Sequence, residues 1–116
     1  MPKRKLDPLP SAAFQILISL ANGQLHGYAI MREVESQSGG RMRLGPGTLY
    51  GSIQALLEEG LIDEVEAGPR TEGSAERRRV YRLTTTGRNL ARSEADRLAD
   101  LLRVARSRKI LRGDYV

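Results

Sequence analysis

The arginines between residues 70 and 82 are the side chains of this sequence best suited to bind another molecule. Five arginines stand in this segment against two glutamates. A guanidinium group is always charged and matches the geometry of phosphate oxygens, which suits it to a nucleic-acid backbone. Arg77, Arg78 and Arg79 are consecutive, and on a strand they cannot all point the same way. At least one of them should therefore meet phosphate, and Arg70 belongs to the same basic segment.

Residues 44–60 have the pattern of a helix that presents a flat face to another surface. Gly45 suits the position before the helix, Pro46 its first position, and Gly60 the left-handed residue that ends it. One side is an apolar stripe made of Leu49, Ile53, Leu56 and Leu57. The opposite side lacks Lys and Arg and carries Thr48, Gly51, Gln54, Ala55 and Glu58, with Tyr50 beside them.

Such a helix fits the major groove of DNA, which is about 12 Å wide, and its N-terminus offers free N–H groups to phosphate. The Gln54 side-chain amide is suited to pair with the N6 and N7 edge of adenine. The alternatives are a solvent-facing helix with a solvated Gln54, or recognition through DNA shape, because Gly51 and Ala55 leave few side chains to read bases.

Residues for enzymatic chemistry are scarce. The chain has no cysteine, which excludes disulfides, thiolate zinc sites and cysteine nucleophiles. Its single histidine, His26, stands before a helix start, where local hydrogen bonding is expected. Glu58 and Glu59 would point about 100° apart on a helix. The sequence therefore predicts no enzyme, no metal site and no cofactor.

The overall composition favours an anionic partner. The chain has 116 residues, enough for one domain, and its 19 Lys and Arg against 14 Asp and Glu give a net charge of +5. Nucleic acid is the first candidate. No apolar run approaches the ~18 residues of a membrane span, and the start Met-Pro-Lys-Arg-Lys is not followed by a signal-peptide core. We expect a cytoplasmic protein with no membrane contact.

The first expected helix runs from Ser11, as its cap, to about Ala21. One side is formed by Phe14, Leu17, Ile18 and Ala21, and a second, nearly opposite, by Ile16 and Leu20. A small domain cannot cover both sides with its own core, so the second side is expected to meet another chain. The next helix, over about 27–37, should bury Ile30, Met31 and Val34. Arg41 and Arg43 lead on to residues 44–60 and are further candidate DNA-binding residues.

After Gly60 the pattern changes to strands over 61–66 and 77–83 with a polar loop between them. Thr84 is expected to cap a last helix that runs to about Lys109. Its apolar seam is made of Ala91, Ala95, Leu98, Leu101, Leu102 and Ala105. A helix of about 35 Å, at ~1.5 Å per residue, exceeds what a small domain needs, so the seam is expected to contact a partner.

Three helices followed by a two-stranded ribbon is the order of a winged helix-turn-helix. We therefore expect a mainly α protein with a small β-ribbon. It would consist of a basic arm at 1–10, a winged DNA-binding domain at 11–84, and a C-terminal dimerisation helix and tail at 85–116.

Four motifs narrow this further, namely His-Gly-Tyr at 26–28, Gly-Thr-Leu-Tyr at 47–50, Leu-Leu-Glu-Glu-Gly-Leu-Ile at 56–62, and Arg-Val-Tyr-Arg-Leu-Thr at 79–84 followed by Gly87. In this order, over about residues 9–102, the chain resembles the PadR family of transcriptional regulators. The resemblance implies a dimeric repressor whose third helix and wing bind a pseudo-palindromic operator on double-stranded DNA. It implies DNA contacts from Thr48 and Tyr50, with Tyr28 near the DNA backbone, and a dimer formed by the first and last helices. The single long last helix is similar to the family's short subgroup.

The chain departs from the family pattern at three points. Gly51 stands where proline is common, and Gly45 where a serine or threonine cap is frequent; each should weaken the helix by up to ~1 kcal/mol. The last helix has no aromatic residue to stack a flat aromatic ligand.

Two questions remain open from the sequence. A homodimer interface lined by Phe14, Leu98, Leu101 and Leu102 would leave room for a small apolar effector that alters the spacing of the recognition helices. The rival interpretation is a winged helix used only for protein–protein interaction. The five acids between Glu58 and Glu66 favour that rival. In a DNA-binding protein we expect them to turn away from the DNA.

Overall fold

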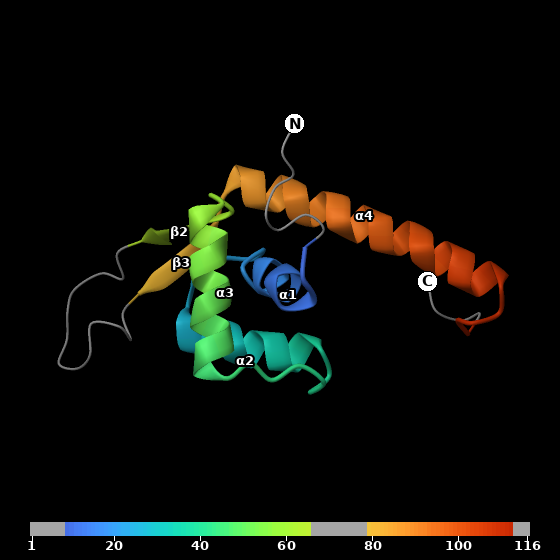
Figure 1. The fold of residues 1–116 in the computed structure, drawn as a ribbon, viewed down its shortest axis with the longest axis horizontal. Coiled ribbons are helices and arrows are strands. Elements are labelled where there is room, and N and C mark those ends of the chain that lie inside the picture. Colours follow the sequence, from blue (N-terminus) through green and yellow to red (C-terminus); the bar gives the residue numbers. More distant parts are fainter. Residues whose placement is uncertain (1–8, 66–78, 113–116) are drawn as a thin grey trace.

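The computed structural model describes residues 9–65 and 79–112. In chain order its elements are α1 (Ser11–Ser19), β1 (Leu25–His26), α2 (Gly27–Gln37), α3 (Pro46–Glu58), β2 (Ile62–Val65), β3 (Val80–Leu83) and α4 (Thr85–Ser107). The first three helices gather beside the sheet, and α4 leaves the end of β3, passes α1 and extends beyond the other helices (Figure 1). The predicted mainly α fold with a small β component and a long last helix is confirmed.

The sheet has three antiparallel strands in the order β1-β3-β2, where we predicted a ribbon of two. The strand that we did not predict, β1, is only two residues long, and its Leu25 lies opposite Tyr81 on β3. Two residues are too few to produce an alternating pattern, so β1 exists only through its pairing with β3. Leu61 and Arg79, which were predicted within strands, lie just outside β2 and β3, and residues 66, 77 and 78 lie outside the described part of the chain.

The core corrects our interpretation of the first helix. Ile16 is 0% exposed and Leu20 2% exposed, and both lie in the same core as Leu17. Because α1 packs against α2, α3 and α4, most of its circumference is covered from within the chain. The prediction that Ile16 and Leu20 contact another chain is therefore wrong. The outward residues are instead Ile18, which is 42% exposed, and Ala21, beyond the end of the helix.

The helix ends mostly follow the local signals. The predicted bounds of α2 are confirmed, and α3 begins after Gly45 with Pro46 in its first turn. Gly60 has a φ of 73°, the left-handed conformation expected after α3. The predicted Ser11 cap is wrong, since Pro10 occupies that position and makes no side-chain capping bond. Proline lacks an N–H, but it fixes the extended backbone from which a helix can start.

The start of α4 is attached to the end of α3 by hydrogen bonds around Thr84. Its hydroxyl accepts a bond from the Gly87 N–H at 2.9 Å and donates one to the Gly60 carbonyl at 2.8 Å. The Thr84 N–H donates to the Leu61 carbonyl at 3.2 Å. A Cβ on Gly87 would collide with that same carbonyl, and would lie 2.9 Å from its carbon. Glycine is required here, and the direction in which α4 leaves the core follows from this contact.

The far end of α4 is two residues earlier than predicted. The helix ends at Ser107, and Lys109 adopts a left-handed φ of 63°. The N–H of Lys109 donates to the Arg106 carbonyl at 3.0 Å, and that of Ile110 to the Ala105 carbonyl at 2.9 Å. This is the bonding pattern of a Schellman motif, which satisfies the last carbonyls of a helix.

Candidate nucleic-acid interface

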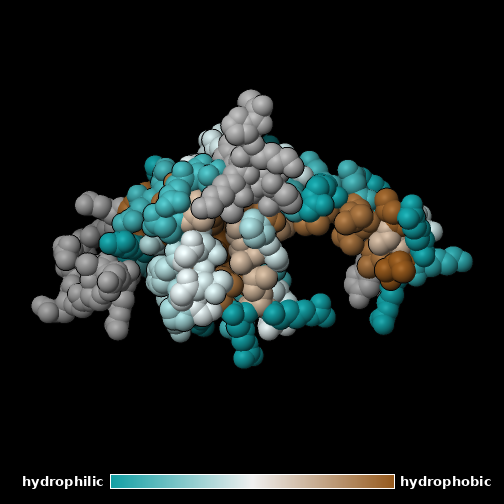
Figure 2. Space-filling model, viewed as in Figure 1, coloured by the Kyte–Doolittle hydropathy of each residue, from teal (hydrophilic) through white to brown (hydrophobic). Residues whose placement is uncertain are grey.

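The outward face of α3 is exposed and free of bulky aliphatic side chains. Thr48, Gly51 and Gln54 are exposed, while the stripe on the other side is buried, with Leu57 partly so. In Figure 2 the surface over α3 is pale, neither strongly hydrophilic nor strongly hydrophobic. Gly47 and Gly51 have no left-handed φ, and no atom beyond the helix lies within 4 Å of where their Cβ would be. Packing does not require glycine at either position, and the backbone is open to a close approach by another molecule.

Gln54 already has a partner on its own helix. Its Nε2 donates to Glu58 Oε2 at 3.2 Å, one helical turn away. To pair with a base, the Gln54 amide would have to give up its hydrogen bond to the Glu58 carboxylate. That carboxylate also places a negative charge on the same face of the helix. The role of Gln54 in reading a base stays a prediction.

Tyr50 joins α3 to the start of α2. A Cβ on Gly27 would lie 2.7 Å from the Tyr50 hydroxyl, so the tyrosine side chain lies directly over the buried glycine. Tyr50 is nevertheless 43% exposed. The structure therefore brings the His-Gly-Tyr and Gly-Thr-Leu-Tyr motifs together. The two motifs are far apart along the chain, and nothing in the sequence indicates that they lie together.

The other predicted contact residues of α2 and the α2–α3 connection are exposed. Tyr28 is 63% exposed and carries the Arg32 guanidinium 5.9 Å from its ring centroid. Arg41 and Arg43 are exposed, and Arg43 Nε lies 3.4 Å from Glu35 Oε2. Arg32, which the sequence analysis did not select, thus adds a cation beside Tyr28.

The acidic residues of β2 pair with arginines of the wing, which is the ribbon formed by β2 and β3. Glu64 on β2 lies 3.8 Å from Arg79 and Asp63 lies 3.6 Å from Arg82. The expectation that these acids turn away from DNA stays a prediction. The antiparallel register places Asp63 opposite Arg82, and unlike charges attract across a strand pair. The other predicted wing residues, Arg70, Arg77 and Arg78, lie outside the described residues.

The predicted dimer residues divide into two groups. Phe14 and Leu98 are half-buried, whereas Leu101 is 55% and Leu102 47% exposed. Sequence reasoning did not select Val104, although it is exposed beside them. Figure 2 shows hydrophobic surface gathered toward the C-terminal end of α4. The apolar effector gap would form only between two copies and stays a prediction.

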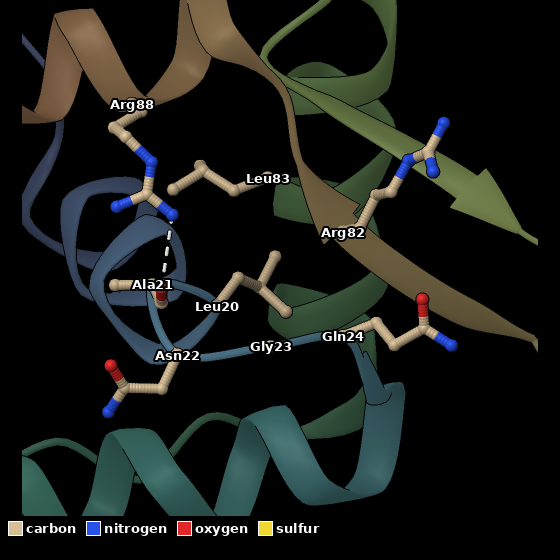
Figure 3. Close-up of a pocket in the computed structure, with 8 residues that line it drawn as sticks. All are labelled: Leu20, Ala21, Asn22, Gly23, Gln24, Arg82, Leu83 and Arg88. Carbon is tan, nitrogen blue, oxygen red and sulfur yellow. Dashed lines mark hydrogen bonds between the residues drawn. The ribbon is translucent and has the colours of Figure 1, made fainter.

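A separate hollow lies beside the N-terminal end of α4, which we call the root of α4. It has a volume of about 360 Å³ and is lined by residues 20–24, Arg82, Leu83 and Arg88 (Figure 3). Arg88 Nη2 donates to the Ala21 carbonyl at 3.0 Å and so connects α4 to the end of α1. The sequence gives no signal of this hollow, because its residues come from two distant segments, 20–24 and 82–88.

Other chemistry is limited in the described residues. His26 is exposed at the end of β1. Across residues 9–65 and 79–112, no group of three metal-binding side chains comes together, and no helix is both long and apolar enough to cross a bilayer. Burial raises the pKa of the Tyr81 phenol above its ordinary value, helped by the nearby Glu64 carboxylate. These observations leave the surface of α2, α3 and the wing as the candidate site.

Comparisons with known proteins agree with the fold. Residues 16–93 match the transcriptional regulator PadR-like family. The chain is 40% identical, over 90 residues, to an uncharacterized 37.1 kDa protein in transposon TN4556 of Streptomyces fradiae. This match covers 78% of the chain but 24% of that protein, so the chain spans about a quarter of the length of the curated relative.

Two solved structures share the architecture. A PadR family transcription regulator from Clostridium difficile has a TM-score of 0.69 at 19% identity, covering 84% of this chain and 97% of that chain. Bacillus subtilis PadR in complex with operator DNA has a TM-score of 0.60 at 23% identity, covering 72% of this chain and 47% of that chain. At these identities the likeness establishes the fold.

Proposed function

Because this chain belongs to the PadR-like family of transcriptional regulators, we propose that it binds double-stranded DNA at a specific operator as a homodimeric repressor. In this proposal, residues 11–84 form the DNA-binding domain, residues 1–10 a basic arm, and residues 85–116 a dimerisation helix and tail. The protein acts in the cytoplasm, with no catalytic activity and no cofactor.

The open backbone of α3 is the observation that carries this proposal. Glycine inside a helix costs about 0.5–1 kcal/mol relative to alanine, and packing gives no reason to accept that cost at Gly51. A groove wall that approaches the helix closely gives such a reason. The N-terminus of α3 also offers unpaired N–H groups, which suit phosphate.

The cations around α3 would position it on the DNA. Arg41 is exposed, Arg43 and Arg79 each make an exposed ion pair, and Arg79 also shares a side-chain hydrogen bond with Tyr81. Such pairs contribute about 0–1 kcal/mol, so phosphate can replace the carboxylate at little cost. Tyr28 would approach the backbone from α2, with Thr48 and Tyr50 nearer the groove. Arg70, Arg77 and Arg78 would add contacts from the wing.

The exposed apolar surface of α4 supports the dimer. The side chains of Leu101 and Leu102 are exposed to solvent in a single chain, and a second copy would cover them. Two recognition helices related by a two-fold axis would read a pseudo-palindromic operator. A small apolar effector between the copies, lined by Phe14, Leu98, Leu101 and Leu102, would change the separation of these helices.

The proposal is tested by capturing genomic fragments with the purified protein, sequencing them, and titrating the enriched duplex against a scrambled one at two salt concentrations. Arg79→Gln should weaken binding to both duplexes and lower the salt slope by about one unit. Gln54→Ala should lower the preference for the operator by about 1–3 kcal/mol at one base position and spare non-specific affinity. Equal loss on both duplexes for Gln54→Ala would remove the reading role. Absence of any enriched fragment would contradict the proposal itself.

The second candidate is a winged helix that binds only proteins. The pairing of Arg79 with Glu64 and of Arg82 with Asp63 favours it, because each pair reduces the positive charge of the wing. Absence of binding to any duplex even at low salt, by a protein that is folded in circular dichroism, would support this alternative.

A further inference from the structure

We propose that the hollow at the root of α4 binds a small oxyanion, a phosphate or a carboxylate group, between Arg82 and Arg88. The residues that line it include these two arginines and no aspartate or glutamate. Leu20, which is buried, and Leu83, which is partly buried, add apolar side chains to this lining. Its volume of about 360 Å³ lies at the small end of the ~300–1,000 Å³ usual for ligand pockets.

Arg88 is already placed for this role. Its Nη2 donates to the Ala21 carbonyl at 3.0 Å, which fixes the guanidinium over the hollow (Figure 3). A guanidinium has five N–H donors, and the bond to the Ala21 carbonyl uses one of them. The remaining donors match the paired oxygens of a phosphate or carboxylate group.

Arg82 would have to turn inward. In Figure 3 its guanidinium points from β3 toward β2, where Asp63 lies 3.6 Å away. Both side chains are more than half exposed, at 58% and 51%, so this pair is weak. An oxyanion beside Arg88 would offer Arg82 a second acceptor in place of Asp63.

Occupation of the hollow would then reach the wing. If Arg82 leaves Asp63, the negative charge of the Asp63 carboxylate is no longer neutralised. Asp63 lies on β2, which pairs with β3, and Arg79 directly precedes β3. The bound anion adds further negative charge, and both changes oppose the approach of DNA phosphates. This consequence rests on the proposed DNA-binding function, whereas the binding of the oxyanion does not. Occupation should weaken operator binding about 5-fold or more, the usual lower range for coupled sites.

The binding step is tested on the full chain without DNA. Inorganic phosphate and acetate are titrated separately, at constant ionic strength, by isothermal calorimetry or by amide NMR shifts. We expect saturable binding of at least one probe, with shifts around residues 20–24 and 82–88. Tighter binding of phosphate would point to a phosphate-bearing ligand, and tighter binding of acetate to a carboxylic acid.

Variants separate the hollow from general attraction to a basic protein. Arg88→Gln and Arg82→Gln should each weaken binding about tenfold or more, which corresponds to the loss of one charge-assisted hydrogen bond. Arg92→Gln is the matched control, because Arg92 is an exposed arginine one turn further along α4 and outside the hollow. It should change affinity less than twofold. Should Arg88→Gln fail to fold in circular dichroism, the exposed Arg82→Gln decides the question.

Two results would overturn the inference, namely no saturable binding of either probe, or equal weakening in Arg92→Gln. Operator titrations with and without phosphate then test the coupling. Failure to bind oxyanion with intact operator binding refutes this inference alone. Oxyanion binding without any DNA binding refutes the proposed function and leaves the site.

Discussion

At the scale of single residues, the glycines within the described helices fall into two kinds. Gly27 and Gly87 are buried where a Cβ would meet Tyr50 or the Leu61 backbone. Gly47 and Gly51 face open space. The first kind allows two elements to pack closely, and the second leaves the α3 surface flat. Substitution by alanine should therefore have opposite effects on stability at the two kinds of site.

Gly87→Ala should lower the free energy of unfolding by about 1–3 kcal/mol, because the added methyl group has to displace the Leu61 backbone and with it the Thr84 hydrogen bonds. Urea unfolding monitored by circular dichroism measures this. Gly51→Ala is the control, and should be stabilising. Equal stability of wild type and Gly87→Ala would show that the contact is not required.

Tyr81 should make stability depend on pH in the alkaline range. Its pKa is raised above 10.0 in the folded state, chiefly by burial, so the folded chain holds the phenolic proton more tightly than the unfolded chain. This contribution is complete below the unfolded pKa and is lost as pH rises through the folded pKa. Urea unfolding at about pH 8 and about pH 10.5 should show a smaller decrease for Tyr81→Phe than for wild type. An equal decrease would contradict this role.

At the scale of elements, α3 combines a buried stripe with a face that costs helix stability. Gly51→Ala should raise the free energy of unfolding by about 0.5–1 kcal/mol. It should also lower duplex affinity, because the methyl group lies where a groove wall would approach. Asn89→Ala, exposed on α4, is a control that changes helix propensity away from this face. A more stable Gly51→Ala protein with unchanged DNA affinity would contradict close approach at this position.

The end of α4 places a lysine in a conformation that favours glycine. The left-handed φ of Lys109 costs roughly 1 kcal/mol in a residue with a Cβ. Lys109→Gly should therefore slow amide hydrogen exchange at residues 105–110, since the Schellman bonds would form without that cost. Arg108→Gly, at a φ of −99°, should not slow exchange. Faster exchange in Lys109→Gly would contradict this explanation of the helix end.

At the scale of the whole molecule, the apolar surface of α4 lies beyond the core of the single chain. Changing Leu101 and Leu102 together to Glu should abolish the proposed dimer and leave the fold intact, because both side chains are exposed in one copy. Light scattering gives the mass, and circular dichroism checks the fold. Ser93→Glu, exposed on a different side of α4, should remain dimeric. A double variant of unchanged mass would exclude this surface as the interface.

Local signals in the sequence determined most of the elements and their order. Gly45 and Pro46 mark the start of α3, Gly60 its end, and Thr84 the start of α4, because capping depends on residues within one turn of the helix end. The 3.6-residue spacing of Leu49, Ile53 and Leu56 likewise predicted the buried side of α3. The family followed from motifs of the same local kind.

Tertiary structure alone decided what depends on distant partners. β1 forms because Leu25 meets Tyr81, and Ile16 and Leu20 are buried because three helices surround α1. The need for glycine at position 87 comes from the Leu61 carbonyl, and the pairing of Asp63 with Arg82 comes from strand register. Each of these depends on residues well apart along the chain. Periodicity reports only which side of an element is apolar, and the packed structure determines what lies against it.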